Sequence, residues 1–488
     1  MRSQSAVSNW APKASVAHLL KKAASVSLLL TLLILAFWVR SFTFWLPHWT
    51  GDQSQYIALA MKMNHTEGLS AYNLREVNVR SAQMSVFKDF NFVIPTYAAG
   101  DEGTLMKSYY GFGLSYYDMP LWYKAPLLPY VLKWSHNIFL GSEKPFVVPQ
   151  TNMGTAVFKV KPKVLLESQF WLVIVPLAAS LGTLVVIYFF TRNFLSVSGS
   201  LMAVWIMAFN PVSILCSNRI WTEDLQTFLL WVGILLYWKG YFSKKTLLPF
   251  CSGILIGLSV LTNQKTMLLF PGMWFYGVIS QDQFSIKKPA SWIKAAFHPN
   301  FLWMLVGFAL VTHRWFLAAY HQLGHPLWQP DYSSATSILA TTWVKHLQSR
   351  PHSLIVYIIG GSYLCPPIFF GYMSVIPSVR NFFRLIKRKL RHSVSIFLWV
   401  SMLPLLRIFM LEAHHSAEHR YLMPILPALS ILAAMSLTRL HEKISGYFLS
   451  KNILTALIWS LLILSAVWSV RIAWHVIMRG KVLIDVPF

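Results

Sequence analysis

Long apolar stretches recur along almost the whole sequence, and they limit the fold more than any other feature. A helix needs about 20 mainly apolar residues to cross a bilayer. Hydrophobic residues make up 55% of the 488-residue chain and charged residues only 12%, which is more apolar surface than a soluble core can bury. The sequence therefore predicts an all-α, polytopic transmembrane protein with about 11 spans, at residues 24–46, 169–190, 199–217, 223–241, 247–263, 266–280, 301–320, 353–376, 393–411, 420–438 and 453–475.

Lysine and arginine residues concentrate in alternate connections between these windows. The N-terminal tail is basic, and so are the connections that the window count places on the same side, of which residues 379–392 are the most basic. Because basic loops are retained in the cytoplasm, the N-terminus is predicted to be cytoplasmic. The same rule accounts for the net charge of +25 without a nucleic-acid partner.

The chain is predicted to form one transmembrane domain with a long first outer loop. A cytoplasmic tail covers residues 1–23, the membrane domain covers 24–476 with the loop at 48–168, and a short tail covers 477–488. Within the loop, residues 119–141 are apolar overall but contain Lys124, Pro126, Pro129 and Lys133. Counting this segment as a span would move the basic cluster at 379–392 outside. We therefore predict a helix that lies in the membrane interface.

Acidic residues are scarce, and three of them stand at the ends of spans on the predicted outer face. Asp52, in "TGDQSQY", follows the first window, and Glu223 and Asp224 begin the window 223–241. All three can cap helices or interact favourably with a helix dipole. Asp52 can equally act as a general base, and Glu223 or Asp224 can ligate a divalent cation or position an acceptor. The sequence leaves both interpretations open.

Cationic residues on the same face could bind a phosphate group. Arginine offers two parallel donors to a phosphate, and lysine offers a point charge. Each side chain could instead reach for lipid headgroups at the interface. Lys265 is the strongest phosphate candidate because it lies in a very short turn, "LTNQK", with no acid beside it; the others are Lys124, Arg219, Arg314 and Arg420.

A histidine-rich segment, "EAHHSAEHRY", precedes the window 420–438. His415 and His419 are spaced by four residues, as are His414 and Glu418, and such pairs on a helix could bind a metal. No second motif of metal-binding spacing accompanies them, so a solvated polar loop is the alternative. The candidate ligands are His415, Glu418 and His419, for Mg, Mn or Zn, and no cofactor is required by the sequence.

Taken together, these motifs resemble the GT-C superfamily of polytopic glycosyltransferases, and in particular the bacterial branch related to protein O-mannosyltransferases and lipid A aminoarabinose transferase. The matching segments are "TGDQSQYIALA", "YKAPLLPYV", "RIWTEDLQTFLL", "LTNQK" and "RYLMPILPAL". The resemblance implies a polyprenyl-phosphate-linked sugar as donor. It also implies a catalytic base at Asp52, a second acid at Glu223 or Asp224, and phosphate contacts from Lys124, Lys265 and Arg420. Members of the family often have a second acid directly after the first, where this chain has Gln53.

Two functions from different classes follow. The first is an enzyme that transfers the sugar with inversion to a lipid, glycan or protein acceptor at the non-cytoplasmic face. The second is a transporter or flippase for a lipid-linked sugar, which would place charges in the middle of spans, where Arg314 and Arg407 are the candidates. Acids at the ends of spans favour the enzyme. Its expected location is the bacterial plasma (inner) membrane, among membrane lipids, with the site facing the periplasm or exterior; the alternative is the ER membrane with a lumenal site.

Overall fold

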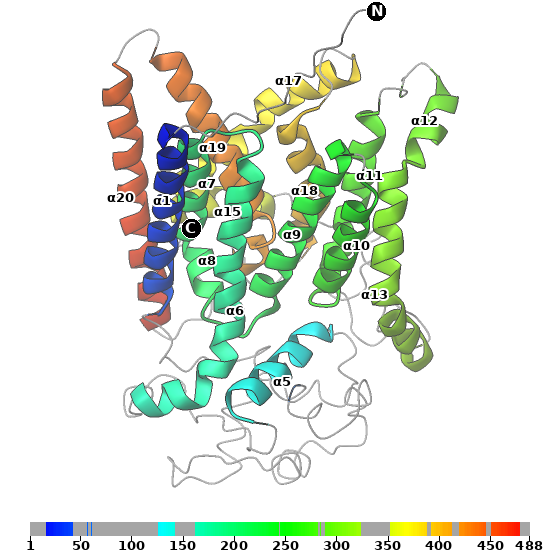
Figure 1. The fold of residues 1–488 in the computed structure, drawn as a ribbon, viewed down its shortest axis with the longest axis horizontal. Helices are drawn as coiled ribbons and strands as arrows, with labels where there is room; N and C mark the ends of the chain where they lie inside the picture. Colours follow the sequence, from blue (N-terminus) through cyan, green and yellow to red (C-terminus); the bar gives the residue numbers. More distant parts are fainter. Residues whose placement is uncertain are drawn as a thin grey trace, which may run out of the picture.

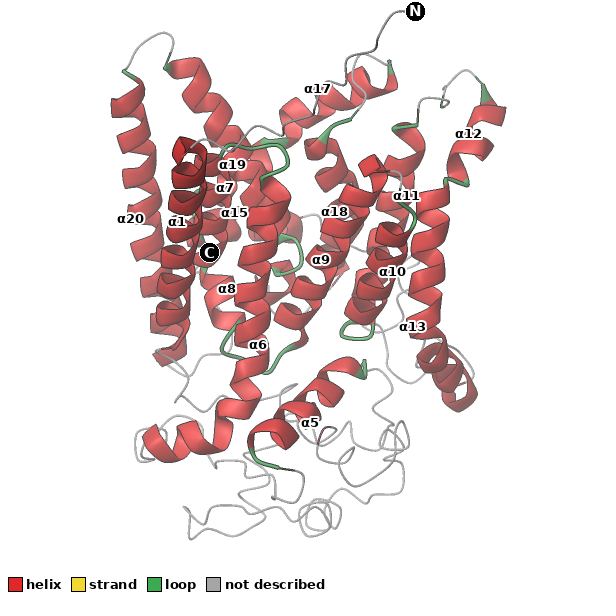
Figure 2. Cartoon of the chain, in the orientation of Figure 1, coloured by secondary structure: helices red, strands yellow, loops and turns green. Residues whose placement is uncertain are grey.

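The computed structural model describes residues 16–41, 56, 60, 125–141, 162–243, 245–281, 284, 288–323, 352–387, 392–411, 419–445 and 450–478. Within these residues the regular structure is entirely α-helix and short 3-10 helix, which confirms the predicted all-α class (Figure 2). The helices form a bundle in which successive long helices run in opposite directions (Figure 1).

The elements follow the chain in a simple order. They are α1 (Val16–Ser41), α5 (Leu127–Phe139), α6 (Pro162–Thr191), α7 (Val197–Ala208), α8 (Pro211–Cys216), α9 (Thr222–Ser243), α10 (Leu247–Val260), η5 (Gln264–Leu268), α11 (Leu269–Ile279), α12 (Pro289–Ala296), α13 (Pro299–Leu323), α15 (His352–Leu364), α16 (Ile368–Met373), α17 (Val375–Ile386), α18 (Val394–Leu411), η7 (His419–Leu422), α19 (Leu426–Ile444) and α20 (Lys451–Met478).

Each apolar window of the sequence contains a helix or a pair of helices. Four helical segments are long and apolar enough to cross a membrane: Ala23–Ser41, Phe170–Thr191, Pro299–His321 and Lys451–Val476. The window 199–217 is divided into α7 and α8, because Pro211 cannot continue a helix and Asn210 caps the new one by accepting a hydrogen bond from the Val212 N–H at 3.0 Å. The window 266–280 holds only the 11-residue α11 behind η5.

The core of the bundle is built around α9 and α19, whose buried residues pack against α6, α7, α8 and α18. The outer helices instead expose apolar side chains, as Leu461, Leu464 and Val467 do on α20. A water-soluble bundle would be polar on this face, so the exposed apolar surface supports a membrane protein. α10 and α13 cross closely, since a Cβ at Gly253 would lie 1.9 Å from the Met304 carbonyl oxygen and one at Gly307 would lie 2.1 Å from the Phe250 carbonyl oxygen.

The helix α5 lies across one end of the bundle, the lower end in Figure 1. Its 13 residues are too few to cross a bilayer core, which needs about 20. Leu128 and Leu132 pack against Trp171 of α6, and the Leu127 N–H donates to the Leu261 carbonyl at 2.8 Å. The segment predicted as an interfacial helix is therefore a helix docked beside the turn that carries Lys265.

Candidate active site

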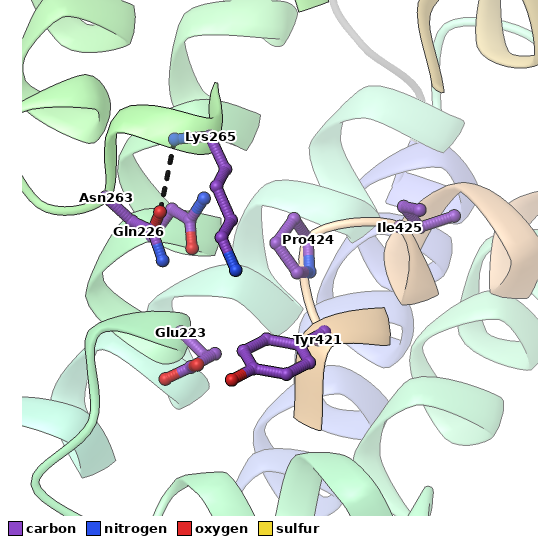
Figure 3. Close-up of a pocket in the computed structure, with 7 residues that line it drawn as sticks. All are labelled: Glu223, Gln226, Asn263, Lys265, Tyr421, Pro424 and Ile425. Atoms are coloured by element: carbon purple, nitrogen blue, oxygen red, sulfur yellow. Dashed lines mark hydrogen bonds between the residues drawn. The ribbon is translucent and has the colours of Figure 1, made fainter. Parts of the chain in front are cut away.

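A pocket lies at the end of the bundle to which α5 is docked. The first turn of α9, η5 and η7 meet there. The pocket holds about 320 Å³ of space, including solvent at its mouth, and Figure 3 shows its lining side chains: Glu223, Gln226, Asn263, Lys265, Tyr421, Pro424 and Ile425. Two of the residues singled out from the sequence, Glu223 and Lys265, are thus brought together although they belong to different helices.

Asn263 ties the Lys265 turn to the first turn of α9. Its Oδ1 accepts the backbone N–H of Lys265 at 3.1 Å, and its Nδ2 donates to Thr222 Oγ1 at 3.3 Å. Thr222 Oγ1 in turn donates to Glu223 Oε2 at 3.4 Å. A short amide side chain that bonds the backbone two residues later is the usual way to form such a turn. Asn263 therefore fixes the backbone of Lys265 beside Glu223.

Two cations lie against aromatic rings at the pocket. Lys265 Nζ is 4.3 Å from the centre of the Tyr421 ring, and Arg420 Cζ is 4.9 Å from the same ring and 4.7 Å from that of Trp221. Arg420 Nη2 also donates to Tyr421 Oη at 3.1 Å. Cation–π contacts hold the two positive charges close together before any anion arrives. This arrangement suits a phosphate group, which accepts hydrogen bonds from both kinds of cation.

Arg219 lies behind this cluster and does not line the pocket. It is almost completely buried, and its Cζ is 6.0 Å from the Trp221 ring. Burial lowers the pKa of Arg219 to about 9, which leaves the guanidinium charged at neutral pH.

The two neighbouring acids occupy different environments. Glu223 lines the pocket, whereas Asp224 is only 1% exposed and lies inside the bundle. Asp224 interacts electrostatically with Arg40 of α1, which is itself fully buried. Ser180 is close to both: its Oγ accepts from Arg40 Nε at 3.2 Å and it acts electrostatically on Asp224. Among the described residues, however, neither oxygen of Asp224 accepts a hydrogen bond of ordinary geometry.

Arg40 joins four helices. Its Nη1 donates to the Ala36 carbonyl of α1 at 3.2 Å and to the Ala208 carbonyl of α7 at 2.8 Å. Its Nη2 donates to Ser213 Oγ of α8 at 2.9 Å, and its Nε reaches Ser180 of α6. Sequence reasoning missed this residue, because nothing in the local sequence of α1 indicates its partner on α9.

Several predicted site residues lie outside the described residues. These are Asp52, Lys124, His415 and Glu418, and the side chain of His419. Within the part of the chain that the structure describes, no group of three His, Cys, Asp or Glu side chains could hold a metal ion. Arg314 is described and is exposed on α13, away from the lining of the pocket.

Comparisons with known proteins show what this chain is similar to. Residues 153–308 match the family described as dolichyl-phosphate-mannose-protein mannosyltransferase, and this stretch contains both Glu223 and Lys265. The structure of ArnT from Cupriavidus metallidurans bound to undecaprenyl phosphate superposes with a TM-score of 0.51 at 10% sequence identity, over 94% of this chain and 76% of that one. The chain has the GT-C fold. The resemblance drawn from its sequence motifs is thereby confirmed.

A second GT-C structure is similar to a comparable degree. The archaeal oligosaccharyltransferase AglB from Archaeoglobus fulgidus, in complex with an inhibitory peptide and a dolichol-phosphate, has a TM-score of 0.50 at 12% identity. The match covers 94% of this chain but only 56% of AglB. No curated protein sequence matches this chain. The comparisons together show that the chain shares its fold with these two proteins.

Proposed function

We propose that this protein transfers a sugar from a polyprenyl-phosphate-linked donor to a lipid, glycan or protein acceptor. The observation that carries the proposal is the pair of cations, Lys265 and Arg420, held around Tyr421 at a pocket that also contains the carboxylate of Glu223. Positive charges beside an acid suit a reaction in which a phosphate departs while an acceptor is bound. The printed names of ArnT and AglB, with undecaprenyl phosphate and a dolichol-phosphate bound, support the same class of donor.

The reaction assigns a separate role to each charged residue. Asp52 takes the proton from the acceptor hydroxyl as the oxygen attacks the anomeric carbon of the sugar. The bond between that carbon and the phosphate oxygen breaks, and the electron pair leaves with the polyprenyl phosphate. Lys265 and Arg420 stabilise the charge that develops on this leaving group. Attack from the side opposite the phosphate inverts the anomeric configuration.

Lys124 and Glu223 complete the proposed site. Lys124 lies three residues before Leu127, the first residue of α5, in the sequence. The Leu127 N–H donates a hydrogen bond to the carbonyl of Leu261, which precedes the turn that carries Lys265. This connection supports a role for Lys124 as a further phosphate contact. Glu223 is the second acid of the proposal, because it lines the pocket whereas Asp224 is buried inside the bundle. We assign it to orienting the acceptor, without a metal-dependent step.

The membrane topology is part of the proposal. About eleven spans, a cytoplasmic tail at 1–23, a membrane domain at 24–476 and an outer loop at 48–168 are supported by the alternating directions of the helices in Figure 1. Basic residues gather at the end of the bundle opposite the pocket, among them Arg192, Lys239, Lys294, Arg384 and Arg439. By the positive-inside rule the pocket then faces the periplasm or exterior of a bacterial inner membrane, or the lumen of the ER.

A flippase for the same lipid-linked sugar is the second candidate, and one observation favours it. The buried pair of Arg40 and Asp224 places charges inside the bundle, as transporters do. Arg40, however, is hydrogen-bonded to two backbone carbonyls and two serines, which suits a fixed structural role better than a moving one.

A reconstituted assay distinguishes the glycosyltransferase from the flippase. The purified protein in lipid vesicles is given undecaprenyl-phosphate hexoses and pentoses with a total membrane extract as the source of acceptor, and released undecaprenyl phosphate is quantified by mass spectrometry. We expect release by the wild type and none by Asp52→Asn. Movement of the intact donor across the bilayer without release would support the flippase and contradict the enzyme.

A further inference from the structure

Gln226 occupies the wall of the pocket next to Glu223, and its role is not accounted for by the reaction above. We propose that Gln226 Oε1 is a fixed hydrogen-bond acceptor that selects a sugar carrying a hydroxyl or amino hydrogen at one position. The proposal deepens the proposed function and rests on it, because it takes the ligand of the pocket to be the donor's sugar. It makes Gln226 a specificity-determining residue.

A chain of hydrogen bonds fixes which end of the Gln226 amide faces the pocket. Ser259 Oγ donates its only hydrogen to the backbone carbonyl of Gln226 at 2.9 Å, since a carbonyl can only accept. At its 3.2 Å contact with Thr266 Oγ1, Ser259 must therefore be the acceptor and Thr266 the donor. Thr266 Oγ1 then has no hydrogen left for Gln226, so it accepts from Gln226 Nε2 at 2.7 Å. The oxygen of the amide is consequently the atom left for the pocket.

The fixed orientation is protected from water. Ser259 and Thr266 are fully buried and Gln226 is 2% exposed, so no solvent molecule can easily replace these bonds. A flipped amide would set Oε1 against Thr266 Oγ1, two oxygens without a hydrogen between them. Within the described residues the Gln226 side chain makes one hydrogen bond, through Nε2. Gln226 Oε1 is therefore available to accept a hydrogen bond from a ligand.

The pocket has acceptors on one wall and a ring on the other. Gln226 and Glu223 are three residues apart on α9, so both side chains lie on the same face of that helix. In Figure 3 they stand with Asn263 on one side of the pocket, while Tyr421, Pro424 and Ile425 stand on the other and Lys265 extends between them. Asn263 is already bonded through both ends of its amide. A sugar at the mouth of this pocket can donate hydrogen bonds to Gln226 and Glu223, with its phosphate toward Lys265, whose Nζ lies over the Tyr421 ring.

A sugar that lacks the matching hydrogen would leave Gln226 Oε1 without a partner in a nearly dry site. Leaving a buried acceptor unsatisfied lowers kcat/KM by about 10- to 100-fold. Replacing the amide with an apolar side chain of the same shape removes this requirement, because there is then no acceptor to satisfy.

The test compares hydroxyl recognition in the wild type and in Gln226→Met, in which an unbranched side chain of similar size lacks the acceptor. Undecaprenyl-phosphate hexoses lacking one hydroxyl at a time are used as donors, and kcat/KM is measured for each. We expect one deoxy donor to react about 10- to 100-fold less efficiently than the parent hexose with the wild type, and about equally well with Gln226→Met. The same penalty in both proteins would overturn the proposal.

Two further variants separate selection from packing. Thr266→Val removes the partner that fixes the amide, and we expect it to weaken the discrimination of the wild type. Thr227→Val changes the next residue of α9, which is buried but does not line the pocket, and should leave the discrimination intact. Equal loss in both variants would attribute the effect to packing and contradict the proposal.

A binding measurement distinguishes failure of this inference from failure of the proposed function. Thermal stabilisation by an undecaprenyl-phosphate hexose is compared with that by undecaprenyl phosphate alone. The hexose should add stabilisation in the wild type and less in Gln226→Met, whether or not any sugar is transferred. Transfer without this difference would reject the role of Gln226, whereas the difference without transfer would reject the enzyme and keep the sugar site.

Discussion

Lys265 is the residue on which the phosphate site depends most directly, because it projects into the pocket from a turn fixed by Asn263. Loss of its charge removes stabilisation of the departing phosphate. We expect Lys265→Met to lower kcat/KM for the donor by about 100-fold, with a smaller change in KM for the acceptor. Steady-state kinetics with each substrate varied in turn measure this. The control is Lys245→Met, which replaces an exposed lysine at the opposite end of the bundle and should behave as the wild type. Donor kinetics that are unchanged in Lys265→Met would show that Lys265 does not contact the phosphate.

Glu223 and Asp224 show how far the sequence predicts such a site residue by residue. The pattern singled out Glu223 and Lys265, which the structure places in one pocket. It did not distinguish the two acids, although adjacent residues on a helix point about 100° apart. Which of the two faces the pocket depends on how α9 packs against neighbouring helices such as α6 and α10. Gln226 was detectable in principle, since it lies three residues after Glu223 on the same helical face, but its fixed amide depends on Ser259 and Thr266.

At the scale of single elements, Arg40 and Asp224 join α1 to α9. Removing Arg40 breaks its four buried hydrogen bonds and takes away the cation that interacts electrostatically with Asp224, and the loss of such a buried group costs about 3–5 kcal/mol of stability. We expect Arg40→Met to unfold at a markedly lower temperature than the wild type, and the double variant Arg40→Met/Asp224→Asn to recover part of the loss. Thermal unfolding in detergent measures both. A double variant less stable than either single variant would show that the two residues are not coupled.

The crossing of α10 and α13 is set by two glycines. A Cβ at Gly253 would lie 1.9 Å from the Met304 carbonyl oxygen, so the helices must separate to accept it. We expect Gly253→Ala to destabilise the fold by about 1–3 kcal/mol. In Gly277→Ala the nearest atom to the new Cβ, Tyr237 Oη, would be 3.5 Å away, and this variant should be tolerated. Equal unfolding temperatures for the two variants would contradict the close crossing.

The elements themselves were more predictable than their breaks and contacts. Hydropathy located the helices because each must bury or present an apolar surface over its whole length. The division of the window 199–217 at Pro211 has a local cause that the sequence displays. The docking of α5 depends instead on Trp171 and the carbonyl of Leu261, which are far from it in the sequence. Periodicity within α5 carries no information about those partners.

For the whole molecule, the decisive expectation is which end faces the cytoplasm. Ile138 on α5 is 78% exposed at the pocket end, and Glu442 is exposed near the end of α19 at the other. In intact cells a membrane-impermeant maleimide should label Ile138→Cys but not Glu442→Cys, which should react only after permeabilisation. The reverse pattern would place the pocket in the cytoplasm and contradict the topology.

The proposed reaction removes a sugar from a lipid phosphate and attaches it to an acceptor, with Asp52 as the base. The most direct test is mass spectrometry of the lipids and glycans from cells that lack the protein, complemented with the wild type or with Asp52→Asn. We predict that one glycosylated product disappears in the deletion, returns with the wild type and stays absent with Asp52→Asn although that variant is present in the membrane. Restoration of the product by Asp52→Asn would contradict the proposed mechanism, and an unchanged set of products in the deletion would contradict the proposed function.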